Sequence, residues 1–97
     1  MRFEWSRFAL ADREAIFDHI EAENCRAAVV VDELIRTRIE GLREFPESGR
    51  PGRVEGTREL VITGTPYIAA YIVAADYIRV LRILHGAQLW PEDLSKE

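Results

Sequence analysis

Residues 58–85 read RELVITGTPYIAAYIVAADYIRVLRILH, and this stretch decides the fold. It contains three runs rich in β-branched and aromatic residues, which are typical of strands: 58–63, 67–74 and 77–85. The breaks between the runs, 64–66 and 75–76, are short enough for hairpins. The second and third runs are apolar at most positions on both faces, as in strands that are covered on both sides. We therefore predict a three-stranded antiparallel meander.

The residues before this meander predict a short strand and two helices. Residues 2–5 suit a strand, and apolar residues then recur at helical spacing from about 8 to 23. Asn24 is a plausible N-cap for a second helix, from about 25 to 45, which Pro46 ends. The expected fold is therefore α+β: an N-terminal strand and a helical hairpin packed on one face of a mainly antiparallel sheet. We expect residues 1–97 to form a single domain.

Composition excludes several classes of protein. Hydrophobic residues make up 47% of the 97 residues and charged residues 31%, which is typical of an ordinary globular chain. A single cysteine cannot form an intrachain disulfide, and with two histidines it makes a structural zinc site improbable. We expect no metal and no cofactor. The longest uncharged apolar stretch, 68–75, is too short to span a bilayer, so we expect a cytoplasmic protein without membrane contact.

The charge balance argues against a protein that mainly grips nucleic acid. The chain carries 13 basic and 17 acidic residues, a net charge of −4, whereas phosphate-backbone binding depends on summed positive charge. Direct nucleic-acid binding is therefore not expected. Twelve of the basic residues are arginines, the better choice for forked contacts with carboxylates or phosphates. Residues 48–91 carry five basic and three acidic groups, which leaves room for a small basic patch.

Five arginines are candidates for binding a partner: Arg50, Arg53, Arg58, Arg79 and Arg82. The first two lie in a glycine-rich loop, 47–56, which lacks the lysine and hydroxyl of a phosphate-binding loop. They face either solvent or an acidic partner. The other three lie in or beside strands that read as core, where an unpaired charge is costly. Each either pairs with an acidic group of the helices or extends its charged end to the rim of the sheet, or else lies on the sheet face away from the helices and binds an anionic target there.

Strict alternation along the last strand assigns its side chains to two faces. It groups Arg79 with Leu81, Ile83 and His85, and it groups Arg82 with Ile78, Val80 and Leu84. His85 closes this strand and is either a general acid or base or a packing and capping residue.

Three aromatic residues are further candidates for the binding surface: Tyr67, Tyr71 and Trp90. We expect them on a sheet face that the helices leave uncovered. Trp90 either anchors a partner or folds back onto the sheet edge.

Three segments together resemble the RelE/ParE superfamily of toxins: 49–61, 66–71 and 78–91. The likeness covers nearly the whole chain and its order of elements. It implies the RelE/ParE-like fold and the toxin of a type II toxin–antitoxin pair, a growth-arresting protein that a cognate antitoxin neutralises by wrapping around it. Acidic groups of this antitoxin are expected to meet the strand arginines.

The superfamily divides by target, and this chain departs from the nuclease branch. RelE-like members cut mRNA on the ribosome, with lysines near the second strand, strand arginines, and a tyrosine or His-Tyr pair after the last strand. Here the loop has no lysine, residues 68–70 read Ile-Ala-Ala in place of an expected arginine, and Gly86 follows His85. Arg58, Arg82 and His85 remain as weak catalytic candidates.

The resemblance therefore favours the ParE-like branch, whose members poison DNA gyrase. The expected function is a non-nucleolytic gyrase inhibitor that is not itself an enzyme. Two alternatives stay open: a ribosome-dependent mRNA interferase, which is an endoribonuclease, and a degenerate toxin that retains only antitoxin binding.

Overall fold

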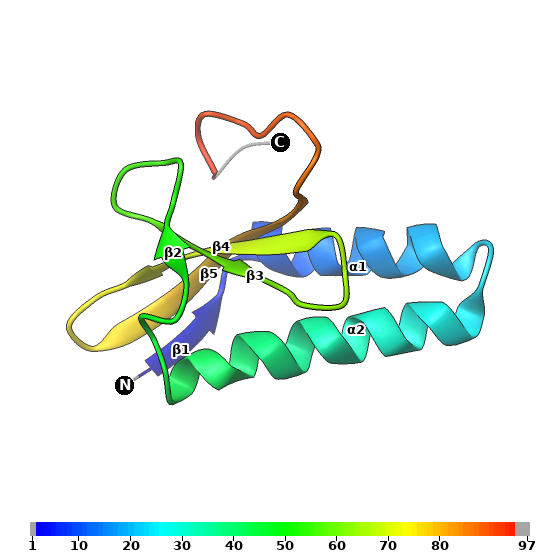
Figure 1. Ribbon diagram of the computed structural model, residues 1–97, viewed down its shortest axis with the longest axis horizontal. Helices are drawn as coiled ribbons and strands as arrows, with labels where there is room; N and C mark the ends of the chain where they lie inside the picture. The colour runs from blue at the N-terminus through cyan, green and yellow to red at the C-terminus, as the bar shows by residue number, and fades with distance from the viewer. Residues whose placement is uncertain (1, 95–97) are drawn as a thin grey trace.

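The computed structural model describes residues 2–94 and shows two helices on a five-stranded sheet. The strands are β1 (Arg2–Trp5), β2 (Arg50–Pro51), β3 (Arg58–Val61), β4 (Tyr67–Val73) and β5 (Tyr77–His85). They lie in the order β1-β5-β4-β3-β2, with β1 parallel to β5 and every other pair antiparallel. The predicted meander and the α+β fold are therefore confirmed (Figure 1).

The helical hairpin forms where helical spacing predicts it. Helix α1 spans Arg7–Glu21 and α2 spans Cys25–Glu40, followed by a 3₁₀ turn, η1, at Gly41–Arg43. Ser6 and Asn24 cap the two helices. Each side chain accepts a hydrogen bond from the backbone N–H of the residue three positions later, Ala9 and Ala27. The second helix ends earlier than the predicted 45, since the chain continues from Gly41 as a 3₁₀ turn. Within residues 2–94, no helix is both long and apolar enough to cross a membrane.

One strand lies in a segment that composition alone assigns to a loop. Arg50 and Pro51 pair antiparallel with Glu59 and Arg58, so the glycine-rich segment begins with a short edge strand. Two residues are too few to show an alternating pattern, so no periodic signal marks them in the sequence.

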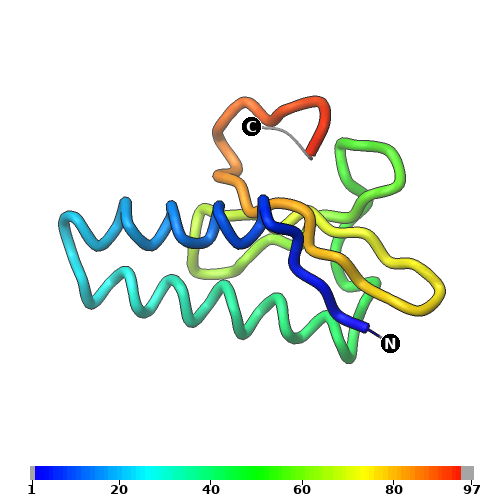
Figure 2. The backbone as a smooth tube through the Cα atoms, turned by 180° about the vertical axis from the view of Figure 1, so that it is seen from behind, coloured from blue at the N-terminus to red at the C-terminus, as the bar shows by residue number. Residues whose placement is uncertain are grey.

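The two faces of the sheet are covered by different parts of the chain. The helices pack on one face, and the largest hydrophobic core lies there, with fully buried side chains from both layers such as Ile35, Ile39, Tyr71 and Ile78. A smaller cluster covers the other face, where the C-terminal segment crosses the sheet (Figures 1 and 2). Its buried members are Ala70, Leu84 and Leu94.

A β-bulge in β5 overturns the face assignment made from strict alternation. Ala70 pairs with Arg82, but the next residue of β4, Tyr71, pairs with Val80, so Leu81 is an extra residue in β5. The bulge shifts the alternation by one residue. Ile83 therefore joins the helix-side core, while Leu81 and Leu84 belong to the cluster on the opposite face.

Candidate functional site

Arg82 is held by an acidic group of the first helix. Its guanidinium makes a forked ion pair with Asp12, with Nε–Oδ2 and Nη2–Oδ1 distances of 2.6 and 2.9 Å. The same carboxylate accepts a hydrogen bond from the Ile83 backbone N–H at 2.9 Å. Arg82 is 7% exposed. Of the two alternatives for this arginine, the structure shows the pairing with a helix.

The other two weak catalytic candidates are also engaged locally. Arg58 donates from Nη1 to the backbone oxygens of Gly49 and Glu47, at 2.5 and 3.4 Å. His85 accepts a hydrogen bond at Nδ1 from the Ala87 backbone N–H, and its ring meets the Tyr67 ring edge-on at 5.7 Å between centroids. These contacts fit the capping and packing interpretation of His85.

The prediction of an uncovered face is wrong for Tyr67, which packs half-buried against the helix-side core, and it is wrong for Tyr71. Its side chain is fully buried in the helix-side core. The hydroxyl donates to the Pro46 carbonyl at 2.8 Å and accepts from the Gly49 N–H at 2.9 Å. Burial raises the pKa of the Tyr71 phenol, which keeps the hydroxyl protonated as a donor. The residue is central to folding the loop onto the sheet, and partners cannot reach it.

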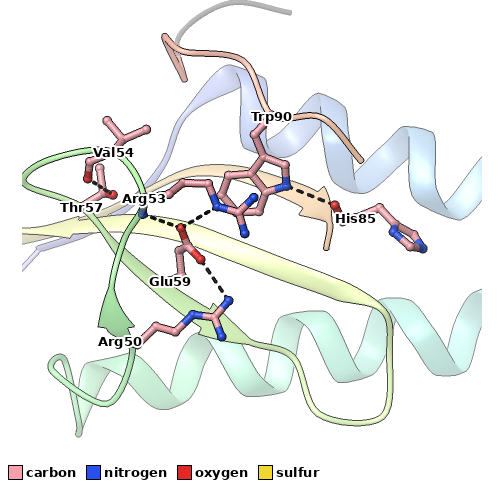
Figure 3. Close-up of polar contacts among 7 residues, drawn as sticks. All are labelled: Arg50, Arg53, Val54, Thr57, Glu59, His85 and Trp90. Atoms are coloured by element: carbon pink, nitrogen blue, oxygen red, sulfur yellow. Dashed lines mark hydrogen bonds and ion pairs between the residues drawn. The ribbon is translucent and has the colours of Figure 1, made fainter. Parts of the chain in front are cut away.

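The structure brings the two loop arginines together on one buried carboxylate. Glu59, in β3, is 3% exposed. Its Oε1 accepts from Arg50 Nη2 at 3.1 Å, and its Oε2 accepts from the Nε and the backbone N–H of Arg53, at 3.1 and 2.8 Å (Figure 3). Both arginine side chains remain about half exposed, at 54% and 42%. The cluster thus presents two oriented cations at the surface.

The same contacts set the ionisation of Glu59. Burial by itself raises the pKa of this carboxyl group, but hydrogen bonds from Arg53 and Arg50 to the charged form outweigh it. The net pKa of Glu59 in the folded chain therefore lies below its ordinary value of 4.5.

This lowered pKa predicts that the cluster stabilises the fold only above acid pH. The contribution is complete above the unfolded pKa of about 4.5 and is lost as the pH falls through the lower folded value. Glu59→Gln should therefore be less stable than the parent at pH 7, and the difference should shrink as the pH falls to about 3. Urea denaturation at successive pH values measures it. Glu33→Gln, which removes an exposed acidic group, is the control; a constant difference for Glu59→Gln would contradict the prediction.

Trp90 folds back onto the sheet instead of projecting from it. The Arg53 guanidinium lies over the Trp90 ring at 3.7 Å from its centroid, and the indole Nε1–H donates to the His85 carbonyl at 3.1 Å (Figure 3).

Arg79 is also held in an ion pair. Its Nη2 lies 3.1 Å from Glu4 Oε1, across the parallel strand pair β1–β5. The partner of Arg79 is therefore an acidic residue of a strand, whereas the sequence predicted an acidic residue of the helices.

A groove of about 470 Å³ lies between the 50–57 loop, β5, the start of α1 and the C-terminal segment. Its apolar lining comes from Phe8, Val54, Leu81 and Leu94. Its polar lining comes from Ser6, Thr57, Arg79, Glu92 and Asp93. Within the part of the chain that the structure describes, no group of three or more His, Cys, Asp or Glu side chains could hold a metal ion.

Sequence reasoning missed the carboxylates that pair with Arg82, Arg50 and Arg53, which are those of Asp12 and Glu59. Asp12 is 70 residues from Arg82 along the chain, and only the packing of α1 on β5 brings them together. Glu59 offered a weak signal, because it is an acidic residue inside an apolar strand that follows an arginine-bearing loop.

A family model described as "ParE toxin of type II toxin-antitoxin system, parDE" matches residues 3–90. The chain belongs to the ParE toxin family. It is thus the toxin of a type II toxin–antitoxin system, and a cognate antitoxin is its partner.

Individual relatives agree with this family. The Y4kP protein of Sinorhizobium fredii is 40% identical over 93 residues, covering 96% of both chains. Toxin RelE2 of Caulobacter vibrioides is 38% identical over 85 residues, covering 88% of this chain and 94% of that one. A chain of a chromosomal ParDE system from P. aeruginosa superposes with a TM-score of 0.81 at 31% identity, covering 88% of this ParE-family chain and 95% of its own.

Proposed function

We propose that this ParE-family toxin acts by binding and inhibiting DNA gyrase and does not itself cut RNA. The observation that carries the proposal is the state of Arg82. RNA cleavage by 2′-hydroxyl attack needs cations free to stabilise the developing phosphate charge. Here the guanidinium is buried and faces the Asp12 carboxylate in a forked ion pair, so a phosphate would have to displace that carboxylate.

The neighbouring strand supports the same proposal. Residues 68–70 are Ile, Ala and Ala, and all three are buried in β4, so no polar side chain arises where the nuclease branch places an arginine. Arg58 and His85 make local contacts that fit structural roles.

We also propose where acidic groups of the antitoxin meet this toxin. Arg50, Arg53 and Arg79 each leave 42% or more of the side chain exposed although they are paired. Arg82 is excluded from this set by its burial. Crystals of the toxin–antitoxin complex test the proposal, and antitoxin carboxylates that contact none of the three exposed arginines would contradict it.

Two reactions run side by side test the main proposal. Purified toxin is titrated into a gyrase supercoiling reaction and into a ribosome-dependent mRNA cleavage reaction, each with and without excess antitoxin. We expect supercoiling to fall and to recover with antitoxin, while the mRNA stays intact. Cleaved mRNA with normal supercoiling would favour the interferase, and no effect in either reaction would favour a degenerate toxin. Both results contradict the proposal.

His85→Gln should leave toxicity unchanged. Glutamine keeps hydrogen-bonding capacity and removes the titratable proton, whose loss from a general acid or base costs about 10²–10⁴ in rate. If His85 only caps and packs, growth arrest on induction should persist with a modest loss of stability. Toxicity abolished in a folded, antitoxin-binding variant, together with mRNA cleavage by the parent, would overturn the proposal.

A further inference from the structure

The chain after the last strand first makes a tight turn. In residues 85–88, the Gln88 side chain accepts from the His85 backbone N–H, and the Gln88 N–H donates to the His85 carbonyl. The segment 89–94, here called the strap, then crosses the sheet face opposite the helices (Figure 1). The strap contains no helix or strand, and Leu89 at its start is 96% exposed.

Leu94 and Trp90 pack the strap against the sheet. Leu94 is 6% exposed and packs with Ala70 and Leu84, the buried apolar residues of this face. Trp90 packs against the same cluster and donates its indole N–H to the His85 carbonyl. Such irregular segments with few apolar contacts open more readily than the sheet beneath them.

The Arg53 guanidinium stacks on the Trp90 ring. At 3.7 Å from the ring centroid, it is within the range of a cation–π contact. Glu59 holds this arginine through both the backbone N–H and Nε, so the position of the guanidinium is fixed by contacts other than the ring. The series Glu59, Arg53, Trp90 therefore links β3 to the strap (Figure 3).

The strap also forms one wall of the groove described above. Glu92, Asp93 and Leu94 line the groove opposite Val54 and Thr57 of the 50–57 loop. If the strap lifts, the groove loses this wall, and the apolar surface around Ala70 and Leu84 is uncovered.

We propose that the stack of Arg53 on Trp90, oriented by Glu59, is a latch that holds the strap closed over the sheet. Closure completes the groove; opening removes its wall and exposes the apolar face. Arg50 shares the same carboxylate but has no contact with the Trp90 ring among the contacts of the described residues, so it provides a matched control.

The latch can be tested through the two tryptophans of the chain. The exchange of each indole N–H with solvent is measured by ¹H–¹⁵N NMR, with the signals assigned by loss of one in Trp90→Phe. In Arg53→Gln we expect the Trp90 indole to exchange about tenfold faster, as the loss of a cation–π contact allows. Arg50→Gln should change it less than about twofold. The Trp5 indole, on the helix side, is the internal reference.

A second variant at the same position keeps the proposal testable if Arg53→Gln does not fold. Arg53→Lys keeps the positive charge beside Glu59 but lacks the planar face that stacks on an indole, so it should release Trp90 in part, less than Arg53→Gln does. Three results would overturn the latch: equal Trp90 exchange in the Arg53 and Arg50 variants, a parallel rise at Trp5, or full protection of Trp90 in both Arg53 variants.

Discussion

Asp12→Ala should lower the free energy of unfolding by about 3 kcal/mol, because it removes one partner of a buried ion pair. Arg82 is 7% exposed and loses the forked carboxylate, while the Ile83 N–H loses its acceptor. The three groups join α1 to β5, beside the hydrophobic core that packs the helices on the sheet. The loss should therefore appear as reduced stability of the whole fold.

Urea denaturation of the parent and the variant measures this loss. Glu33→Gln is the matched control, because its pair with Arg36 is exposed and should contribute less than about 0.5 kcal/mol. A double change to Asp12→Leu and Arg82→Met should recover most of the stability, since apolar side chains of similar size carry no desolvation cost. If Asp12→Ala lowered the free energy of unfolding no more than Glu33→Gln does, the Asp12–Arg82 pair would not stabilise the packing of α1 on the sheet.

The sheet could be predicted from the sequence because its strands carry a clear local signal. The runs around Ile68 and Val80 are apolar, β-branched and separated by short breaks, which specify a meander without further information. The bulge at Leu81 carries no such signal. It arises from the pairing of β5 with β4, and it moves Ile83 and Leu84 to opposite faces from those that alternation assigns.

In the candidate site too, some residues could be predicted from the sequence and their partners could not. Arg82 could be selected from the sequence because a charged residue within an apolar strand is costly unless it is paired. Arg53 could be selected as one of two arginines in the glycine-rich segment 47–56. Their partners could not, since Asp12 reads as one of several acidic residues on a helix and is brought to Arg82 only by tertiary packing. The buried position of Tyr71 depends on the 46–49 turn closing over it, which no periodic pattern describes.

That turn is closed so tightly around one glycine that a methyl group should disrupt it. A Cβ atom at Gly49 would lie 2.5 Å from the Tyr71 hydroxyl oxygen and 2.9 Å from the backbone oxygen of Glu59. Neither can withdraw freely, because Tyr71 is fully buried and Glu59 lies within the sheet. Gly49→Ala should therefore lower the free energy of unfolding by about 2 kcal/mol through overpacking.

Gly41 supplies the matched control for this substitution. A Cβ atom there meets nothing within 4 Å, and the residue already has helical backbone angles, with φ −60° and ψ −19°. Gly41→Ala should therefore stabilise the fold by about 0.5 kcal/mol, by restricting the unfolded chain. Urea denaturation of both variants gives the comparison. Equal effects of the two substitutions would show that the 46–49 turn yields to a side chain.

The clash can also be assigned to its partner by a double-mutant cycle. Tyr71→Phe removes the hydroxyl oxygen that the new methyl group would meet first, although it also ends the hydrogen bonds to Pro46 and Gly49. Gly49→Ala should therefore cost less in the Tyr71→Phe background than in the parent, by about 0.5 kcal/mol or more, as expected for residues in direct contact. Additive losses would instead place the strain at the groups that remain in the Tyr71→Phe background, the ring carbon Cε1 and the Glu59 backbone oxygen, which the Cβ atom would meet at 2.7 and 2.9 Å.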